Sequence, residues 1–129
     1  MSTLSVGTIK SASSAAPVFQ NSSGTEKGQL AKIWVNLQGD GTAAIRDSFN
    51  VSSITDNGTG NYTVTFSNSM SNDDFCCLIT TRKHSNGVTY TTGNINSALS
   101  TSNVVVESFT LSGSTSDTPT MCVAIFGDN

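Results

Sequence analysis

The sequence predicts an all-β protein, an antiparallel β-sandwich or flattened barrel with an extended N-terminal arm. Ser, Thr and Asn make up about 40% of the chain, which combines a strand-forming residue with two turn-forming ones. Short runs rich in β-branched and aromatic residues recur at even intervals from residue 32, with turn residues between them. No credible helical pattern stands among these runs, so the class is antiparallel β.

The size and charge of the chain set further limits. A chain of 129 residues is enough for one domain with a core of moderate size. Only 36% of the residues are hydrophobic and 12% are charged, both below ordinary usage. The low charge argues against an acidic or basic disordered tail.

Residues 1–30 form a region of their own, in which small polar residues separate short apolar patches. Pro17 fixes its own φ and pushes Ala16 toward an extended conformation. A disordered tail and an arm that packs on a neighbouring subunit both fit this pattern. The arm is favoured because Val18 and Phe19 are poor choices for a solvated tail. The residues expected to contact another subunit or another protein of a larger assembly are Leu4, Val6, Ile9, Val18 and Phe19.

Residues 31–129 are predicted to form the β-sandwich domain. The strands are expected at 32–37, 43–46, 48–54, 61–67, 75–82, 87–92, 103–111 and 120–126. Asp47 is expected at a bend between two of them. The polar stretch 67–74 has one apolar anchor, Met70, and is compatible with a single helical turn.

The clearest hairpin joins NVSSIT to NYTVTF through residues 56–60. The turn contains Asn57-Gly58 and Gly60, which supply positive-φ positions for a tight reversal. Alternation along the second strand places three large side chains on one face. Between Ile33 and Phe66, the residues expected in the core or an interface are Trp34, Val51, Ile54, Tyr62, Val64 and Phe66.

Three strands read as continuous apolar runs, at 75–79, 104–106 and 121–126. Such runs indicate that both faces of a strand are covered. One face would meet the opposite sheet, and a neighbouring subunit is the simplest cover for the other.

The three cysteines leave two interpretations open. Cys76 and Cys77 are adjacent, so they should point to opposite faces of a strand and not bond each other. All three could be small buried hydrophobic residues kept reduced. Alternatively, Cys122 could form a disulfide with Cys76 or Cys77 across neighbouring strands.

No motif indicates an enzyme or a metal protein. His84 is the only histidine, and no Gly-x-Ser-x-Gly elbow accompanies it. The cysteine and histidine spacings match no zinc site, and no acidic loop matches a calcium site. The sequence therefore predicts no catalytic residues, no metal and no cofactor.

The charge pattern also argues against nucleic acid as a partner. The net charge is −3, and the cations are scattered except for Arg82-Lys83-His84, whereas phosphate binding needs clustered cations. No run has the roughly 18 apolar residues of a membrane span, and the N-terminus lacks the apolar core of a signal peptide. We therefore expect no membrane partner and synthesis in a cytoplasm.

Loops rich in Ser, Thr and Asn could contact sugars by hydrogen bonding and stacking, although any β-protein shows such loops to water. The candidate residues for a receptor-side loop are Tyr90, Asn94 and Asn96.

Residues 31–70 resemble a module found in tailed phages, particularly those of marine bacteria and cyanobacteria. There, A-x-x-W-V-N-F leads to G-T-x-x-I-R and then to N-V-S-S-I-T-D-N-G-T-G-D-Y-T-V-N-F and an A-M-P-D turn. Here Leu37 replaces Phe, Asn61 replaces Asp, and residues 69–72 replace the A-M-P-D turn. The lead-in 6–19 and the closing 123–126 are also similar to small members that stand alone as separate proteins.

The resemblance implies a virion structural protein, assembled in the host cytoplasm, with no catalytic residues to transfer. Two places on a virion are compatible with it. One is a capsid decoration or accessory protein, trimeric and held by its arm to major capsid or tail proteins. The other is a short tail fibre or fibre tip that touches the host surface, where a glycan could be the receptor. A stand-alone glycan-binding module is a third, less favoured reading.

Overall fold

The computed structural model describes residues 5–10, 17, 19–82 and 90–127, with the backbone alone for 90–94. The chain groups into two compact units, Met1–Leu30 and Ala31–Asn129. All regular elements of the described residues are strands, which confirms the predicted all-β class.

The first unit contains a small hairpin, β1 (Phe19–Gln20) and β2 (Glu26–Gly28), that was not expected in an extended arm. Its turn is organised by Asn21, whose Oδ1 accepts hydrogen bonds from the backbone N–H of Ser23 (3.1 Å) and Thr25 (2.9 Å). A local side-chain acceptor of this kind lets a short polar segment reverse direction without any apolar pattern.

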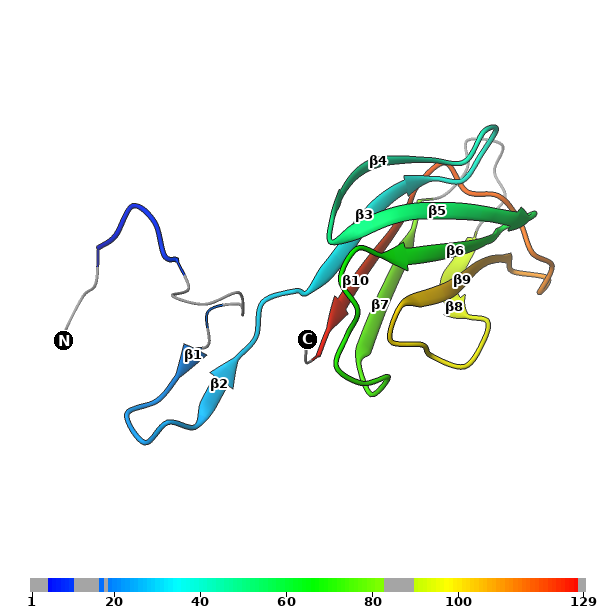
Figure 1. The fold of residues 1–129 in the computed structure, drawn as a ribbon. Helices are drawn as coiled ribbons and strands as arrows, with labels where there is room; N and C mark the ends of the chain where they lie inside the picture. Colours follow the sequence, from blue (N-terminus) through cyan, green and yellow to red (C-terminus); the bar gives the residue numbers. More distant parts are fainter. Residues whose placement is uncertain (1–4, 11–16, 18, 83–89, 128–129) are drawn as a thin grey trace. The chain divides into compact units, whose positions relative to one another are not determined.

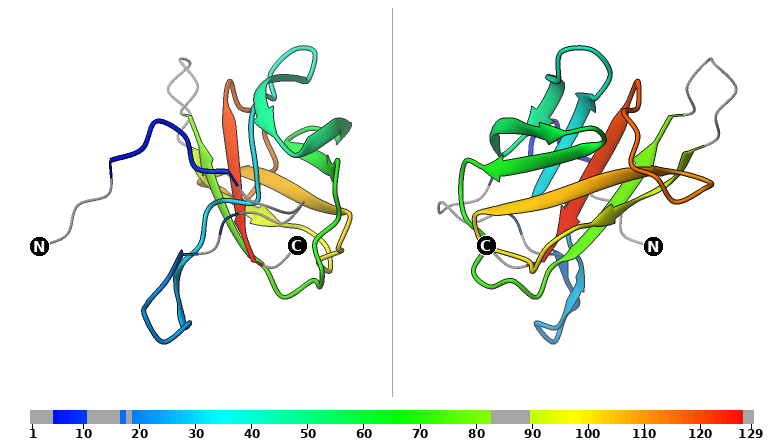
Figure 2. Two further views of the ribbon diagram at one scale, coloured as in Figure 1. Left: turned by 60° about the vertical axis from the view of Figure 1, so that its left-hand side comes forward. Right: turned by 90° about the vertical axis from the view of Figure 1, so that its right-hand side faces the viewer.

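The second unit is a sandwich of two antiparallel four-stranded sheets (Figure 1). One sheet has the order β4-β3-β10-β7 and the other β5-β6-β9-β8. Figure 2 shows the two layers from other sides. The strands are β3 (Ile33–Gln38), β4 (Ala44–Phe49), β5 (Val51–Gly58), β6 (Asn61–Phe66), β7 (Cys76–Thr81), β8 (Tyr90–Ile95), β9 (Asn103–Thr110) and β10 (Met121–Phe126).

The eight predicted strands are found with ends that shift by up to four residues, most of all where β5 (Val51–Gly58) takes the place of the expected 48–54, and two further details were wrong. The bend lies at Asn50, not at Asp47, which is inside β4 near an irregularity in its pairing with β3. Asn50 has a φ of 56° and joins β4 to β5 across the two sheets. Its Oδ1 accepts a hydrogen bond from the backbone N–H of Asn68 (2.8 Å). Asn tolerates this left-handed conformation better than most residues, which makes it a suitable corner.

The segment 67–74 contains bends and no helical turn. Met70 is nevertheless the predicted apolar anchor, since it is buried in the core. The phenyl rings of Phe66 and Phe75, which flank this segment, meet edge to face with centroids 6.0 Å apart.

Alternate residues of the strands fill the space between the sheets, as period-2 patterning requires. Tyr62, Val64 and Phe66 share the inner face of β6, as predicted. The core comprises Ile33, Val35, Leu37, Tyr62, Val64, Phe66, Met70, Phe75, Val104, Val106, Met121, Val123 and Ile125.

Candidate functional site

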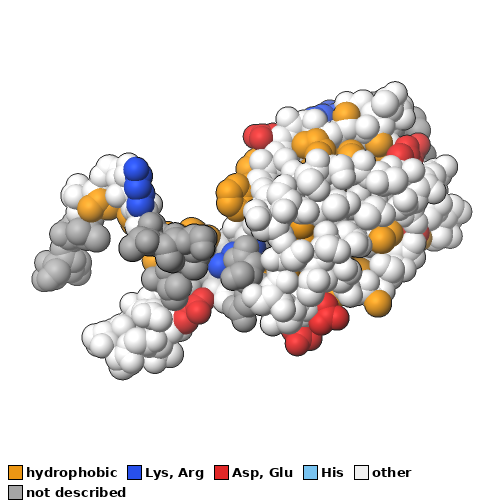
Figure 3. Space-filling model, in the orientation of Figure 1, with side chains coloured by type: hydrophobic (Ala, Val, Ile, Leu, Met, Phe, Trp, Pro, Cys, Tyr) orange, Lys and Arg blue, Asp and Glu red, His pale blue; other side chains and the backbone are white. Residues whose placement is uncertain are grey.

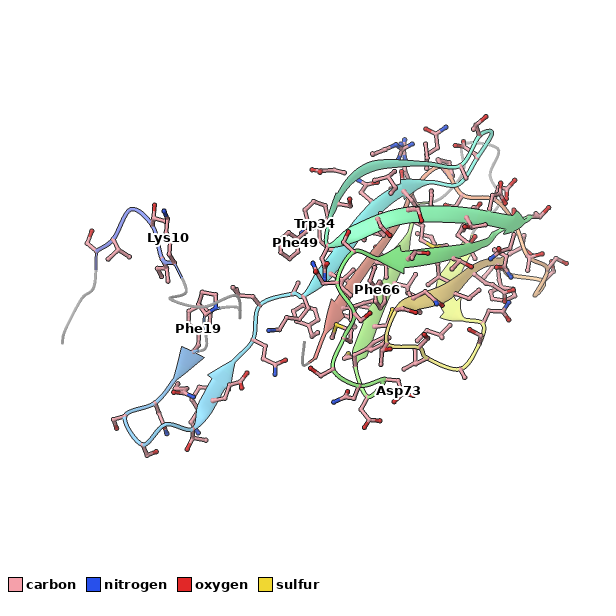
Figure 4. All side chains as sticks on the ribbon, viewed as in Figure 1. Lys10, Phe19, Trp34, Phe49, Phe66 and Asp73 are labelled. Carbon is pink, nitrogen blue, oxygen red and sulfur yellow. The ribbon has the colours of Figure 1, made fainter. Side chains whose placement is uncertain are left out.

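The outer face of the β4-β3-β10-β7 sheet carries large apolar side chains that face solvent. Alternation along β3 and β10 sends one set of residues into the core, so the intervening set must point outward. Backbone register aligns Phe49 with Trp34, Trp34 with Ala124, and Ala124 with Leu78. One apolar row therefore crosses all four strands. Figure 4 shows Trp34 and Phe49 next to each other where β3 begins and β4 ends.

A second, shorter row lies beside the first, where Phe126 pairs with Cys76. Cys122 points outward from the same sheet and is exposed. We call this set the apolar face: Trp34, Phe49, Cys76, Leu78, Cys122, Ala124 and Phe126. Phe49 and Leu78 are each 55% exposed and Trp34 is 37% exposed. Contiguous apolar side chains on one sheet usually mark an interaction surface.

Polar side chains end the apolar face at the other end of β3. Arg46 reaches across this strand and donates from Nη1 to Thr120 Oγ1 (2.6 Å) and from Nη2 to Gln38 Oε1 (3.2 Å). An interface with an apolar centre and a hydrogen-bonded polar rim has the usual anatomy of a protein–protein contact.

The outer face of the β5-β6-β9-β8 sheet has a different character. Its outward residues on β6 are Asn61, Thr63 and Thr65. Asn57 Nδ2 donates to Asn61 Oδ1 (2.9 Å), and Asn61 Nδ2 donates to Glu107 Oε1 (2.7 Å). These bonds link three strands through polar side chains. In Figure 3 the visible surface of the sandwich is mostly neither hydrophobic nor charged.

The predicted arm contacts are exposed wherever the structure describes them. Val6 is 52% exposed, Ile9 is 59% exposed and Phe19 is 45% exposed. Leu4 and Val18 lie outside the described residues. None of the described residues of Met1–Leu30 is buried.

The predicted receptor-side residues do not form one loop. Asn94 belongs to β8 (Tyr90–Ile95), which continues past the expected end at residue 92, and its backbone pairs with Glu107. The side chains of Tyr90 and Asn94 lie outside the described residues. Asn96 is exposed just after the strand, and its N–H donates to the carbonyl oxygen of Val105 (2.9 Å).

The three cysteines are free, so the disulfide interpretation was wrong. Cys122 pairs with Thr80 and Cys76 pairs with Phe126, which places the two thiols four positions apart along the strands, about 13 Å. A disulfide needs Cα atoms within about 7 Å.

The expectation that the cysteines are all buried was also wrong, because Cys76 and Cys122 are exposed. Cys77 points inward beside the core. Burial, with the neighbouring Cys76, raises the pKa of the Cys77 thiol to about 11.

No group of three or more His, Cys, Asp or Glu side chains is arranged to hold a metal ion in the described ranges 5–10, 17, 19–82 and 90–127. His84 lies outside those ranges. The half-buried Glu107 accepts the hydrogen bond from Asn61.

Sequence reasoning did not single out Phe49 and Leu78, two large and exposed members of the apolar face. The signal for Leu78 was present in the continuous apolar run at 75–79, which predicted an outer face in need of cover. Phe49 had no such signal, because it stands between Ser48 and Asn50 and reads as a single apolar residue near a bend. Only its pairing with Trp34 brings it into the row.

Across the described part of the chain, no helix has the length and apolar character needed to cross a membrane. Comparisons of the chain with protein-family models, with curated protein sequences and with solved structures find no match.

Proposed function

We propose that this chain is a non-enzymatic structural protein on the surface of a tailed-phage particle, a capsid decoration or accessory protein that assembles as a trimer. The observation that carries the proposal is the exposed apolar face of the β4-β3-β10-β7 sheet. A protein that works as a lone monomer gains nothing from Trp34, Phe49 and Leu78 in one exposed row, whereas an assembling protein buries them.

The resemblance of residues 31–70 to a module of phage virion proteins supports a particle as the place of assembly. The low charge and the Thr- and Asn-rich outer face of the second sheet are compatible with a surface that stays in water after release. In this proposal the other partners are major capsid or tail proteins, and the protein assembles in the host cytoplasm.

Gold labelling of intact particles tests the proposed place. Antibodies against the purified chain should label the capsid surface of phage particles that carry its gene. Absence of label from intact particles, with label on the free protein as the control, would contradict a role on the virion surface.

The oligomeric state is tested separately by light scattering on the purified chain at micromolar concentration. We expect the mass of three copies. A strictly monomeric species would contradict the trimer without deciding where the protein sits on the particle.

A short tail fibre or fibre tip is the second candidate. The observation that favours it is the polar outer face on which hydrogen bonds join Asn57, Asn61 and Glu107. Amide and carboxylate side chains of this kind can exchange hydrogen bonds with sugar hydroxyls. Gold label at the tail, together with binding of the purified chain to host cells or their lipopolysaccharide, would favour the fibre over the decoration protein.

A further inference from the structure

The arm unit exposes apolar side chains and buries none of its described residues. Its exposed members are Val6, Ile9, Phe19 and Leu30, the last of which is 50% exposed. The only strands described in it are the two short ones of the β1–β2 hairpin. A two-stranded hairpin without a covered face is marginally stable in water. The arm therefore needs an apolar surface that its described residues do not supply.

The apolar face also needs another surface that removes it from water. Its area indicates whether a second apolar face alone would be large enough. The whole outer face of the sheet, with four strands about 4.8 Å apart and six residues each at about 3.3 Å per residue, spans roughly 20 by 20 Å, or on the order of 400 Å², and the apolar face is the smaller part of it that excludes the polar end. A specific interface buries about 800 Å² on each partner. Two such faces laid directly on each other would reach at most about half of that area. A stable assembly through this face needs a further segment that adds apolar contact.

The arm matches the apolar face in chemistry. Lys10 is the one charged residue among residues 1–20, and Ser, Thr, Ala and Gly separate the apolar patches. Small neighbours let an extended segment lie close to a sheet, with its large side chains in contact with those of the sheet. The apolar face itself contains no charged residue. Apart from Lys10, the segment 1–20 would therefore bring no charge against the apolar face, and Glu26 and Lys27 are exposed in the β1–β2 hairpin.

We propose that the apolar face of each copy is covered by the N-terminal arm, residues 1–30, of a second copy. The inference rests on the proposed assembling function and names the segment that makes the contact. Each copy donates one arm and accepts one, which is a head-to-tail contact that closes into a ring such as the proposed trimer.

Photo-crosslinking with isotopically mixed copies tests which copy supplies the arm. Phe19 is replaced by the photo-reactive p-benzoylphenylalanine in unlabelled chain, which is mixed at high dilution with ¹⁵N-labelled wild-type chain and reconcentrated. We expect crosslinks from unlabelled residue 19 to ¹⁵N-labelled peptides of β3, β4, β7 or β10. Crosslinks to these strands within unlabelled chains alone, with none to labelled chains, would show an arm on its own sheet and overturn the proposal. Crosslinks that avoid these four strands would overturn it too.

Thiol protection gives an independent measurement on the full chain. Cys76 and Cys122 lie on the apolar face, so a seated arm should shield them from N-ethylmaleimide. In the oligomer we expect both to react at least roughly tenfold more slowly than in an Ile9→Ser/Phe19→Ser variant. The matched control is Leu111→Ser, which removes a 71% exposed leucine outside both surfaces and should leave the rates unchanged. Equal rates in the wild type and the arm variant would contradict the proposal.

The virion role and the arm contact can be contradicted independently of each other. If gold labels the particles but the crosslinks and the thiol protection are absent, the arm assignment is wrong and the virion role stands. If the arm crosslinks to a second copy but no particle is labelled, the chain assembles as proposed in some other setting.

Discussion

At the scale of single residues, Tyr62 shows how a polar group is accommodated in the apolar core. The residue is fully buried, and its hydroxyl donates to the carbonyl oxygen of Gly39 (2.6 Å) and lies 3.1 Å from Asp117 Oδ1. The same Oδ1 accepts a hydrogen bond from the N–H of Gly60 (2.7 Å). One side chain thus connects β6 to two loops at the end of the sandwich.

Replacement of this hydroxyl should destabilise the fold. Tyr62→Phe leaves the Gly39 carbonyl without that donor in a buried place, so we expect a loss of about 1–3 kcal/mol in the free energy of unfolding. Urea denaturation followed by Trp34 fluorescence measures it. Asp117→Asn keeps an acceptor oxygen for Gly60 and should cost less. A Tyr62→Phe variant as stable as the wild type would show that the bond contributes nothing.

Alkaline pH should destabilise the protein through the buried Tyr62 and the partly buried Cys77. Burial and the carboxylate of Asp117 raise the pKa of Tyr62 above its ordinary 10.0, and burial raises the pKa of Cys77 from 9.0 to about 11. The folded state therefore retains protons that the unfolded chain releases. The contribution of Cys77 is complete below pH 9 and is lost as the pH rises to 11, and that of Tyr62 is complete below pH 10 and is lost above it.

Urea denaturation at a series of pH values from 8 to the alkaline limit of the native state measures this loss. Cys77→Ala should remove the part of the decline that begins near pH 9, and Tyr62→Phe the part that begins near pH 10. A decline of the same size in both variants and the wild type would assign it to other groups.

At the scale of elements, the β5–β6 hairpin is the part of the fold that local sequence specifies best. Its turn residues and its alternation predicted the inner face and the start of β6 at Asn61, whereas β5 continues to Gly58, beyond the expected end at residue 54. Gly60 has a φ of 68° in this turn. A Cβ atom there would lie 2.7 Å from the backbone nitrogen of Ser116 and 2.8 Å from the carbonyl oxygen of Ser108. The turn is thus held by a strand and a loop that are distant in sequence.

Gly60→Ala should therefore cost more than backbone strain alone. We expect a loss of about 3 kcal/mol in the free energy of unfolding, of which about 1 kcal/mol is the left-handed conformation and the rest is the steric conflict with backbone. Gly41→Ala is the matched control, because Gly41 has a φ of 66° and open space around the position of a Cβ atom. Equal losses in the two variants would contradict the close approach at Gly60.

At the scale of the whole molecule, the outer faces of the two sheets differ in chemical character, one apolar and the other polar. One carries the row from Phe49 to Leu78, and the other carries threonines, asparagines and Glu107. The hydrophobic effect drives association only where apolar area leaves water, so assembly is expected through the first sheet and solvent contact through the second.

A Phe49→Ser/Leu78→Ser variant should weaken assembly without unfolding the subunit. Both side chains are 55% exposed, so we expect their loss to change the free energy of unfolding of the single subunit by only about 0.5 kcal/mol. The dissociation constant of the oligomer should rise at least about tenfold, because large apolar side chains at the centre of an interface dominate its energy. Analytical ultracentrifugation measures this rise, with Leu111→Ser as the control. An unchanged dissociation constant would place the interface elsewhere.

The sequence by itself determined what depends on neighbours along the chain. Alternation predicts strands because successive side chains point to opposite faces, and Asn-Gly turns predict reversals because few residues adopt a positive φ. These local rules were sufficient to locate the eight strands of the sandwich, the β5–β6 hairpin and the anchor Met70, but they missed the β1–β2 hairpin. They also indicated that the run 121–126 needs cover on both faces.

Only the tertiary structure decided what depends on partners distant in sequence. The position of β10 between β3 and β7 is set by pairing with residues at least forty positions away in β7 and more than eighty positions away in β3. That pairing turns Cys76 and Cys122 outward at separate positions and joins Phe49 to Trp34 and Leu78 in one row. In a continuous apolar run both faces look alike in sequence, so the choice of inner face comes from how the whole sandwich closes around its core.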